Sequence, residues 1–349
     1  MKAIIYHAHD DIRLENRPVP DIDDDELLLR VHGCGLCGSD ILKIVQKATP
    51  PVKLGHELTG TIVRRGQHVT DFEVGQRVVV AHHVPCGTCH YCRHQNYSMC
   101  SAFKASNLDP CGFAEYIRVP AEHTRHTTLA LPDTLSDEEA SFVEPLACCV
   151  RAVQRTPLLP GDSVVVVGLG SVGLLMLQAV KALGGGQPGA VKVYGVDVLP
   201  ERLILARQLG ADDAFLAPAD EQGLHEMLDA VTDRRGADGA ILTVPGMRPF
   251  LQAIAATRKG GTLNIFAAHS GVAPLDLEAI YTQELTITST YSSSPRELRI
   301  ALDLLTRGSV HVDQLISHRL PLERFAEGVA LMRERAALKV YFTINKAGR

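Results

Sequence analysis

The sequence predicts an α/β protein with two parts, a mostly β body and a parallel sheet inserted into it. Up to about residue 150 the apolar runs are short and broken by Gly and Pro, as in ELLLRVHGCG and TGTIVRRG, which is typical of antiparallel strands. From about residue 160 strand-like and helix-like stretches alternate, as in VKVYGVD, PERLILARQLG and GAILTV. This alternation indicates parallel strands joined by crossover helices, with helices on both faces of the sheet.

The C-terminal part returns to the first body. A helical stretch is expected over 296–307, and the chain ends near the apolar run KVYFTI, which we expect to pair with the first strands. The predicted division is therefore residues 1–152 plus 292–349 for the β body and residues 153–291 for the parallel-sheet domain. The segment GGGQPGA, residues 184–190, is expected to be a loop.

Composition and charge exclude several classes of protein. The 349 residues carry a formal net charge of −5, and 46% are hydrophobic, as in an ordinary globular chain. A nucleic-acid partner is not expected because phosphate binding needs a basic face. No apolar run reaches the roughly 18 to 20 residues that span a bilayer. The first residues have no hydrophobic signal core, so the cytoplasm is the expected location.

The segment GLGSVG, residues 168–173, follows a run of valines and precedes a helical pattern. In a G-x-G-x-x-G turn the first glycine makes the tight turn, the second lets the backbone approach pyrophosphate, and the third lets helix and strand pack closely. The helix that follows presents N–H groups and a positive dipole end to the phosphates. The motif predicts a Rossmann dinucleotide site formed by Gly168, Gly170, Ser171, Val172 and Gly173.

Asp197 ends the next predicted strand, VKVYGVD. A carboxylate there can accept hydrogen bonds from the ribose hydroxyls and repels a 2′-phosphate, so NAD is expected rather than NADP. Its separation from Gly168 exceeds the usual spacing of about 20 residues, and the 184–190 loop accounts for the excess. Arg202, five residues on, either contacts the ribose or is an exposed helix arginine.

Four cysteines lie within 15 residues, in CGTCHYCRHQNYSMC. Thiolates at this spacing can surround one tetrahedral zinc ion with no open position, as a structural site requires. An iron–sulfur cluster is the alternative. Clustered cysteines in a reducing cytoplasm more often bind metal than form disulfides. The predicted structural ligands are Cys86, Cys89, Cys92 and Cys100.

A second metal site is predicted around the stretch GHELTG, residues 55–60, although an isolated His-Glu pair would be interpreted as an exposed turn. Cys37 lies upstream in CGLCGSD and Glu144 downstream in SFVEPLACC. Together with His56 and Glu57 they offer a thiolate, an imidazole and one or two carboxylates. Such a set leaves one zinc position for water or substrate, which indicates a catalytic site.

With these motifs in order, the chain resembles the zinc-dependent medium-chain alcohol dehydrogenase family over essentially its whole length, and its sorbitol (polyol) dehydrogenase branch in particular. The matching pieces are CGSD, GHE, the four-cysteine loop, GFAEY, EPLA and GLGSVG. The resemblance implies a GroES-like, mostly β catalytic domain with an inserted Rossmann domain. It also implies a zinc ion held by Cys37, His56 and Glu57, with Glu144 as an additional or exchanging ligand. Whether Glu57, Glu144 or both contact the resting zinc stays open.

The resemblance further implies that Ser39 takes the proton of the alcohol, that each chain binds two zinc ions, and that the chain forms homodimers or homotetramers across the segment LTITSTY. Leu42 stands where many relatives carry a histidine of the proton relay. Thr290 stands where sorbitol dehydrogenases often carry an arginine, which puts sorbitol itself in doubt.

The leading hypothesis is therefore an NAD-dependent dehydrogenase of a secondary alcohol in a polyol, cyclitol, sugar or sugar phosphate. The alternatives are a threonine or amino-alcohol dehydrogenase of the same family, and a non-catalytic nucleotide-binding protein with one structural zinc.

Overall fold

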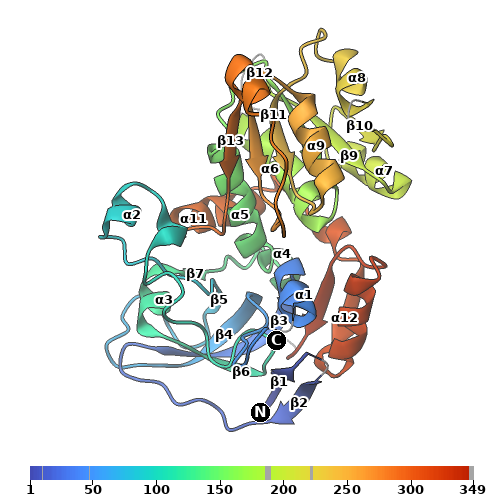
Figure 1. Cartoon of the computed structure of the whole chain (residues 1–349). Coiled ribbons are helices and arrows are strands. Elements are labelled where there is room, and N and C mark those ends of the chain that lie inside the picture. Colours follow the sequence, from blue (N-terminus) through green and yellow to red (C-terminus); the bar gives the residue numbers. More distant parts are fainter. Residues whose placement is uncertain (10, 47, 185–189, 221–222, 346–349) are drawn as a thin grey trace. The chain divides into compact units, whose positions relative to one another are not determined.

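The computed structural model describes all residues except 10, 47, 185–189, 221–222 and 346–349 (Figure 1). It divides into two compact units. The first unit contains Met1–Ala147, Ser293–Arg307 and Val312–Arg349, and the second contains Cys148–Ser292 and Gly308–His311. The sequence places the divisions after residues 152 and 291. Most of the loop predicted at 184–190 lies outside the described residues.

The first unit is built on a seven-stranded, mostly antiparallel sheet. A separate two-stranded sheet is formed by β1 (Lys2–Ala8) and β2 (Asp11–Asn16). The seven-stranded sheet contains, in spatial order, β14 (His318–Pro321), β15 (Val340–Thr343), β3 (Leu27–Gly35), β4 (Glu57–Arg65), β5 (Arg77–Val80) and β7 (Thr128–Ala130), with β6 (Tyr116–Val119) paired to β3.

Short helices connect these strands. The α-helices that lie wholly in the first unit are α1 (Gly38–Val45), α2 (His90–Arg93), α3 (Ala121–His126), α4 (Asp137–Ala140), α11 (Pro295–Thr306) and α12 (Phe325–Arg333). Three short 3₁₀ turns are η1 (Tyr97–Met99), η2 (Asp313–Leu315) and η3 (Leu322–Arg324).

The C-terminal strand β15 joins the N-terminal part of the chain, which confirms the prediction for KVYFTI. It runs antiparallel to β3, with Tyr341 opposite Gly35. Its Phe342 is fully buried and packs against Phe113 and Phe325, with ring centroids 5.5 and 5.2 Å away. Burial of a large aromatic side chain fastens the last strand to the core of this unit.

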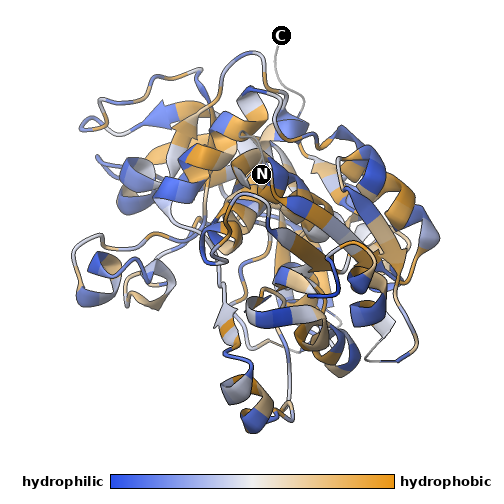
Figure 2. Cartoon of the chain, turned by 90° about the horizontal axis from the view of Figure 1, so that it is seen from above, coloured by the Kyte–Doolittle hydropathy of each residue, from blue (hydrophilic) through white to orange (hydrophobic). Residues whose placement is uncertain are grey.

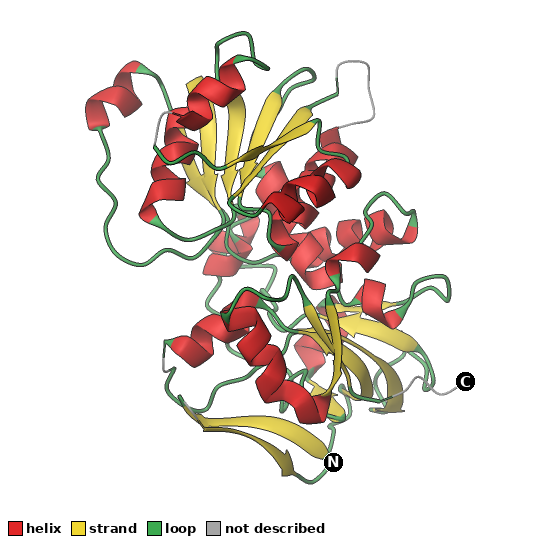
Figure 3. Ribbon diagram, turned by 90° about the vertical axis from the view of Figure 1, so that its right-hand side faces the viewer, coloured by secondary structure: helices red, strands yellow, loops and turns green. Residues whose placement is uncertain are grey.

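The second unit is a six-stranded parallel sheet, as the alternating pattern predicts. Figure 3 shows helices on both faces of this sheet. Its strands are, in spatial order, β10 (Asp213–Leu216), β9 (Lys192–Asp197), β8 (Ser163–Val167), β11 (Ala237–Leu242), β12 (Thr257–Ile265) and β13 (Thr286–Ser289). Because β8 lies between β9 and β11, the turn after β8 is at the carboxyl end of a central strand of the sheet.

The helices of the second unit follow its strands in the chain. They are α6 (Ser171–Gly184), α7 (Pro200–Gln208), α8 (Gly223–Asp229), α9 (Met247–Ala256) and α10 (Leu277–Thr282), and α5 (Val143–Gln154) begins in the first unit. Surface helices alternate hydrophilic and hydrophobic residues, as Figure 2 shows. None of the described helices is long and apolar enough to cross a membrane.

Helix α6 is buried on more than one side. Leu175 and Val180 are buried, and so are Leu174, Leu177 and Gln178. The reason is that Gln178 bonds the backbone of His311 through both ends of its amide, at 2.9 and 2.7 Å. A segment distant in sequence therefore covers a second side of the helix, which its own periodicity does not reveal.

A buried polar network holds α4 to the sheet of the first unit. The Nδ1 atom of buried His32 lies 2.9 Å from the Asp137 carboxylate, and its Nε2 lies 2.9 Å from the Thr61 hydroxyl. Arg77 donates to the same carboxylate at 2.9 Å. Burial by itself raises the pKa of Asp137, but the bonds from His32 and Arg77 outweigh it and hold the pKa below 3.8.

We expect Asp137→Asn to lower the free energy of unfolding by about 1.5 to 3 kcal/mol at neutral pH, because charged hydrogen bonds are lost. Since the folded-state pKa lies below the unfolded value of 3.8, this stabilisation is present above pH 3.8 and is lost as the pH falls through the folded pKa. Urea unfolding at pH 7 and pH 3 measures the change. The exposed Asp133→Asn is the charge-matched control. A difference from wild type that is equal at both pH values would contradict the role of the Asp137 charge.

Candidate active site

Cys37, His56 and Glu57 come together in the first unit. Their ligand atoms lie within 4.8 Å of one another, which is close enough to share one metal ion. Cys37 precedes α1, His56 precedes β4, and Glu57 is the first residue of β4. A thiolate, an imidazole and a carboxylate are ligands that zinc accepts. The GHELTG stretch is therefore no exposed turn, since His56 and Glu57 are both buried.

Cys37 is the N-cap of α1. Its Sγ accepts a hydrogen bond from the backbone N–H of Ser39 at 3.4 Å, and the Asp40 carboxylate bonds back to the Cys37 N–H at 3.3 Å. Ser39 thus lies inside the first turn, and the cap is the cysteine itself. The sulfur of this predicted metal ligand is thus held at the N-terminus of a helix by a backbone N–H group.

His56 is oriented by Asp40, which is fully buried. His56 Nδ1 lies 3.5 Å from Asp40 Oδ1, and Nε2 lies 3.5 Å from the Ser39 hydroxyl. Burial lowers the pKa of His56, but the charges of Asp40 and Cys37 outweigh it and raise the pKa well above 6.5. Metal binding at Nε2 must therefore release a proton, while Asp40 acts as the carboxylate partner of the ligating histidine. Asp40 is part of CGSD, but the sequence assigned it no role.

Glu57 shares its carboxylate with Lys339. The Lys339 ammonium lies 2.8 and 2.6 Å from the two carboxylate oxygens, and both side chains are at most 5% exposed. Gly35, opposite Glu57 on β3, makes room for this pair, since a Cβ there would lie 2.2 Å from Glu57 Oε2. Lys339 reaches the site because it directly precedes β15, which pairs with β3.

Lys339 is a site residue that the sequence analysis missed. Burial lowers its pKa, but Glu57 and Cys37 outweigh burial and raise the pKa above 10.5, so the side chain stays charged. Its ammonium also lies 5.6 Å from the centroid of the Phe142 ring. The available signal was a lysine immediately before an apolar strand, which has no obvious place in a core unless it is paired.

Glu144 lies in the first turn of α5 and is buried. It is near enough to Lys339 to contribute to raising the pKa of that lysine. It does not belong to the three-residue group whose ligand atoms converge within 4.8 Å. Its role as an additional or exchanging ligand therefore stays a prediction.

We expect Lys339→Met to destabilise the metal-free chain by about 3 to 5 kcal/mol, because the Glu57 carboxylate is left buried and unpaired. The double variant Lys339→Met/Glu57→Gln should recover most of this loss, and Lys339→Arg should lose less than the methionine variant. Urea midpoints with a chelator present give the comparison. If the single and double methionine variants were equally unstable, the pair would not be the cause.

The four cysteines of the predicted loop also converge, with ligand atoms within 4.8 Å of one another. The Cys89 and Cys92 sulfurs are 3.5 Å apart, and the Cys86 and Cys92 sulfurs are 4.0 Å apart. Backbone N–H groups of Thr88 and Cys89 lower the pKa of Cys86 to about 6, whereas burial raises that of Cys92 to about 12. Four thiols in this arrangement fit a closed tetrahedral metal site.

The glycine-rich turn of the second unit has the expected form. Gly168 has a φ of +97°, and a Cβ on Gly173 would lie 1.8 Å from the Gly168 carbonyl oxygen. A Cβ on Gly170 would meet nothing within 4 Å. The Ser171 hydroxyl, at the first residue of α6, is buried and has no partner among the described residues. Open space over Gly170 and free donors at a helix N-terminus fit a pyrophosphate.

Asp197 and Arg202 both contact this turn. The Asp197 carboxylate accepts hydrogen bonds from the backbone N–H of Leu169 at 2.6 Å and of Leu199 at 3.0 Å. Arg202 donates to the Leu169 carbonyl at 3.2 Å. The structure therefore brings the predicted ribose partner to the predicted phosphate turn. Thr243, which the sequence analysis missed, bonds the Gly168 carbonyl at 2.6 Å and supports the turn from β11's end.

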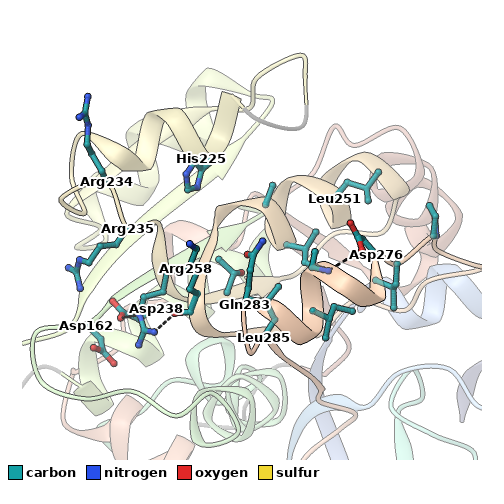
Figure 4. A pocket seen from close by; sticks show the side chains of 18 residues that line it. Asp162, His225, Arg234, Arg235, Asp238, Leu251, Arg258, Asp276, Gln283 and Leu285 are labelled. Carbon is teal, nitrogen blue, oxygen red and sulfur yellow. Dashed lines mark hydrogen bonds and ion pairs between the residues drawn. The ribbon is translucent and has the colours of Figure 1, made fainter.

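A cavity of about 1200 Å³ in the second unit lies elsewhere (Figure 4). Its lining includes Asp162, Asp238 and Arg258, which lie at the amino ends of β8, β11 and β12. The glycine-rich turn follows the carboxyl end of β8, whereas the cavity lies at the amino ends of the strands. Because parallel sheets bind dinucleotides at the carboxyl ends of their strands, this cavity is not the cofactor site. Arg258 and Asp238 pair with each other across its wall.

Comparison with known proteins gives matches to two family models. Residues 23–133 match the alcohol dehydrogenase GroES-like domain, and residues 171–307 match the zinc-binding dehydrogenase model. The first range includes Cys37, His56, Glu57 and the four-cysteine loop. The second begins at Ser171, within the glycine-rich turn.

Whole-length relatives agree with these matches. The chain is 32% identical to the sorbitol dehydrogenase of Bacillus subtilis (strain 168), with 99% of this chain and 98% of that protein aligned. It is 31% identical to the D-arabitol-phosphate dehydrogenase of Enterococcus avium, with the same coverage. Among solved structures, the alcohol dehydrogenase TADH from Thermus sp. ATN1 superposes with a TM-score of 0.85, at 29% identity, over 99% of this chain and 100% of that one.

Proposed function

Because the chain belongs to the zinc-dependent medium-chain alcohol dehydrogenase family, we propose that it oxidises a secondary alcohol of a polyol or polyol phosphate with NAD⁺. The observation that carries this proposal is the convergence of Cys37, His56 and Glu57 on one point. A non-catalytic nucleotide-binding protein would have no need of such a group. The relatives named for sorbitol and arabitol phosphate support a polyol rather than a simple alcohol as substrate.

Each chain is proposed to bind two zinc ions, one at the Cys37 group and one in the four-cysteine loop. Four sulfur ligands of the second group would close a tetrahedral zinc site, whereas the three ligands of the first group would leave a position for substrate. None of the nine cysteines forms a disulfide in the structure. Thiol ligands of this kind persist in a reducing compartment, which supports action in the cytoplasm.

The chain's own residues would act on the substrate as follows. When bound, zinc supplies Lewis acidity that lowers the pKa of a hydroxyl, and NAD⁺ accepts hydride. Ser39 is exposed, and its hydroxyl lies 3.5 Å from His56 Nε2, so it can receive the alcohol proton and pass it to water. Asp40 lies beside the His56 ring, and Lys339 holds the Glu57 carboxylate in place.

The cofactor preference is proposed to be NAD over NADP. Asp197 has a carboxylate within hydrogen-bond distance of the Leu169 backbone at the turn, and this charge would repel a 2′-phosphate. The Arg202 guanidinium donates a hydrogen bond to the Leu169 backbone carbonyl, and no role in binding a 2′-phosphate is proposed for it.

We expect two zinc ions per chain and NADH formation with one class of a substrate panel. The panel should hold polyols, polyol phosphates, cyclitols, threonine and simple alcohols, each with NAD⁺ and with NADP⁺. Cys37→Ser should lose one zinc and all activity, whereas the matched control Cys148→Ser, outside both metal groups, should lose neither.

Glu144→Ala would show whether Glu144 is a ligand of the resting zinc. If it is, the substitution lowers zinc occupancy. If it is a carboxylate near the site that does not contact the metal, the substitution lowers turnover alone. One zinc in the wild type and no activity with any alcohol would sink the catalytic proposal. Activity confined to threonine would replace the polyol with an amino alcohol.

We also propose that the chain is a homo-oligomer joined across the edge strand β13. This strand is the last of the described parallel sheet and pairs with a neighbouring strand, β12, on one side only. The preceding segment exposes Val272, Leu277 and Tyr281, with relative exposures of 91, 74 and 83%. Exposed apolar side chains in the segment that leads into an edge strand support a contact with a second copy.

Light scattering should give a dimer or tetramer for the wild type. The double variant Leu277→Glu/Tyr281→Glu should dissociate, because charges would be buried in the contact. Leu159→Glu, at an equally exposed leucine distant in sequence, is the control and should keep the assembly. A monomeric wild type would refute the proposal.

A further inference from the structure

Four aromatic rings form a continuous stack in the first unit, and the stack begins at the metal ligand His56. The ring centroids of His56 and His82 are 4.4 Å apart, those of His82 and His83 are 3.7 Å apart, and those of His83 and Phe103 are 4.8 Å apart. The interplanar angles are 39, 38 and 39°. Each ring thus contacts the next with nearly the same tilt between the ring planes.

The far end of this ring stack belongs to the four-cysteine loop. Phe103 is 1% exposed and packs in one cluster with Cys92 and Cys100, two of the four thiols. Its carbonyl accepts a hydrogen bond from the Val84 N–H at 3.2 Å, directly after the two histidines. The loop and the 82–84 segment are therefore joined by both backbone and side-chain contacts.

The middle of the ring stack is fixed from a third direction. Ala81, just before His82, accepts bonds from His123 Nδ1 at 3.0 Å and from the Thr127 hydroxyl at 3.1 Å. His123 Nε2 in turn lies 2.9 Å from the hydroxyl of Ser106, close after Phe103. A segment held at Ala81 and at Val84 has little freedom to move its two imidazoles.

The two central imidazoles each have one ring nitrogen without a hydrogen-bond partner in the described part of the chain. Nδ1 of His82 and Nδ1 of His83 are buried and have no partner among the described residues. The in-plane contact of His56 is also loose, because its Nδ1 lies 3.5 Å from Asp40 without hydrogen-bond geometry. The face of the His56 imidazole is thus restrained by its contact with the His82 ring, whose centroid is 4.4 Å away.

We propose that His82, His83 and Phe103 are positioning residues that transmit the order of the four-cysteine loop to the metal ligand His56. An ion bound by the four thiols holds Phe103, Phe103 holds the two imidazoles, and these hold the plane of the His56 ring toward Cys37 and Glu57. The loop then has a part in the active-site geometry as well as in stability. This inference rests on the proposed zinc site at Cys37, His56 and Glu57.

Cobalt(II) in place of zinc at the Cys37 group gives a test that does not depend on turnover, because its visible bands report ligand geometry. His83→Ala interrupts the ring stack without touching either ligand group. We expect altered cobalt bands and an ion affinity weaker by about tenfold or more, as for loss of other outer partners of a ligating histidine. His83→Phe restores a ring and should restore both. His94→Ala, an exposed histidine of the same loop, should change neither.

Wild-type bands in His83→Ala, with wild-type affinity, would overturn the proposal even if the variant is less stable to heat. Failure of His83→Phe to restore the bands while the chain stays folded would also overturn it, since the imidazole nitrogen would then be the essential feature. A third result would contradict the proposed metal site itself: the thiolate–cobalt bands of the wild type are unchanged in Cys37→Ser. This result is distinct from the outcomes with His83→Ala and His83→Phe.

Discussion

The buried ion pair of Glu57 and Lys339 is the interaction on which the candidate active site depends. The two residues are 282 positions apart and meet only because β15 pairs with β3 beside β4. Neither charge is stable alone in a site where both side chains are at most 5% exposed. Pairing of β15 with β3 therefore brings Lys339 to the candidate metal site.

Helix N-termini contribute to both candidate binding sites. Cys37 caps α1 and accepts an N–H bond at its sulfur, and the glycine-rich turn leads into α6 with a free serine hydroxyl. In both places backbone N–H donors and the positive end of the helix dipole favour a negative partner. One physical effect thus acts on the Cys37 sulfur in the first unit and on the turn for phosphate in the second.

The ligand His56 depends on support from several directions. Asp40 contacts its edge, His82 lies on its face, and the Ser39 hydroxyl lies near its Nε2 atom. None of these partners is unusual by itself. Their joint effect is to leave the imidazole few orientations, which is what a metal site with an open position needs.

What the sequence by itself determined is what depends on neighbours in the chain. The parallel sheet, the turn at Gly168–Gly173 and the spacing of the four cysteines follow from periodicity and local spacing, and the structure has all three. The tertiary structure alone decided which distant groups meet: Lys339 at Glu57, Asp40 at His56, and the second covering of α6 at Gln178. These contacts depend on strand pairing and burial between remote segments, and no local pattern encodes the distance between two such segments.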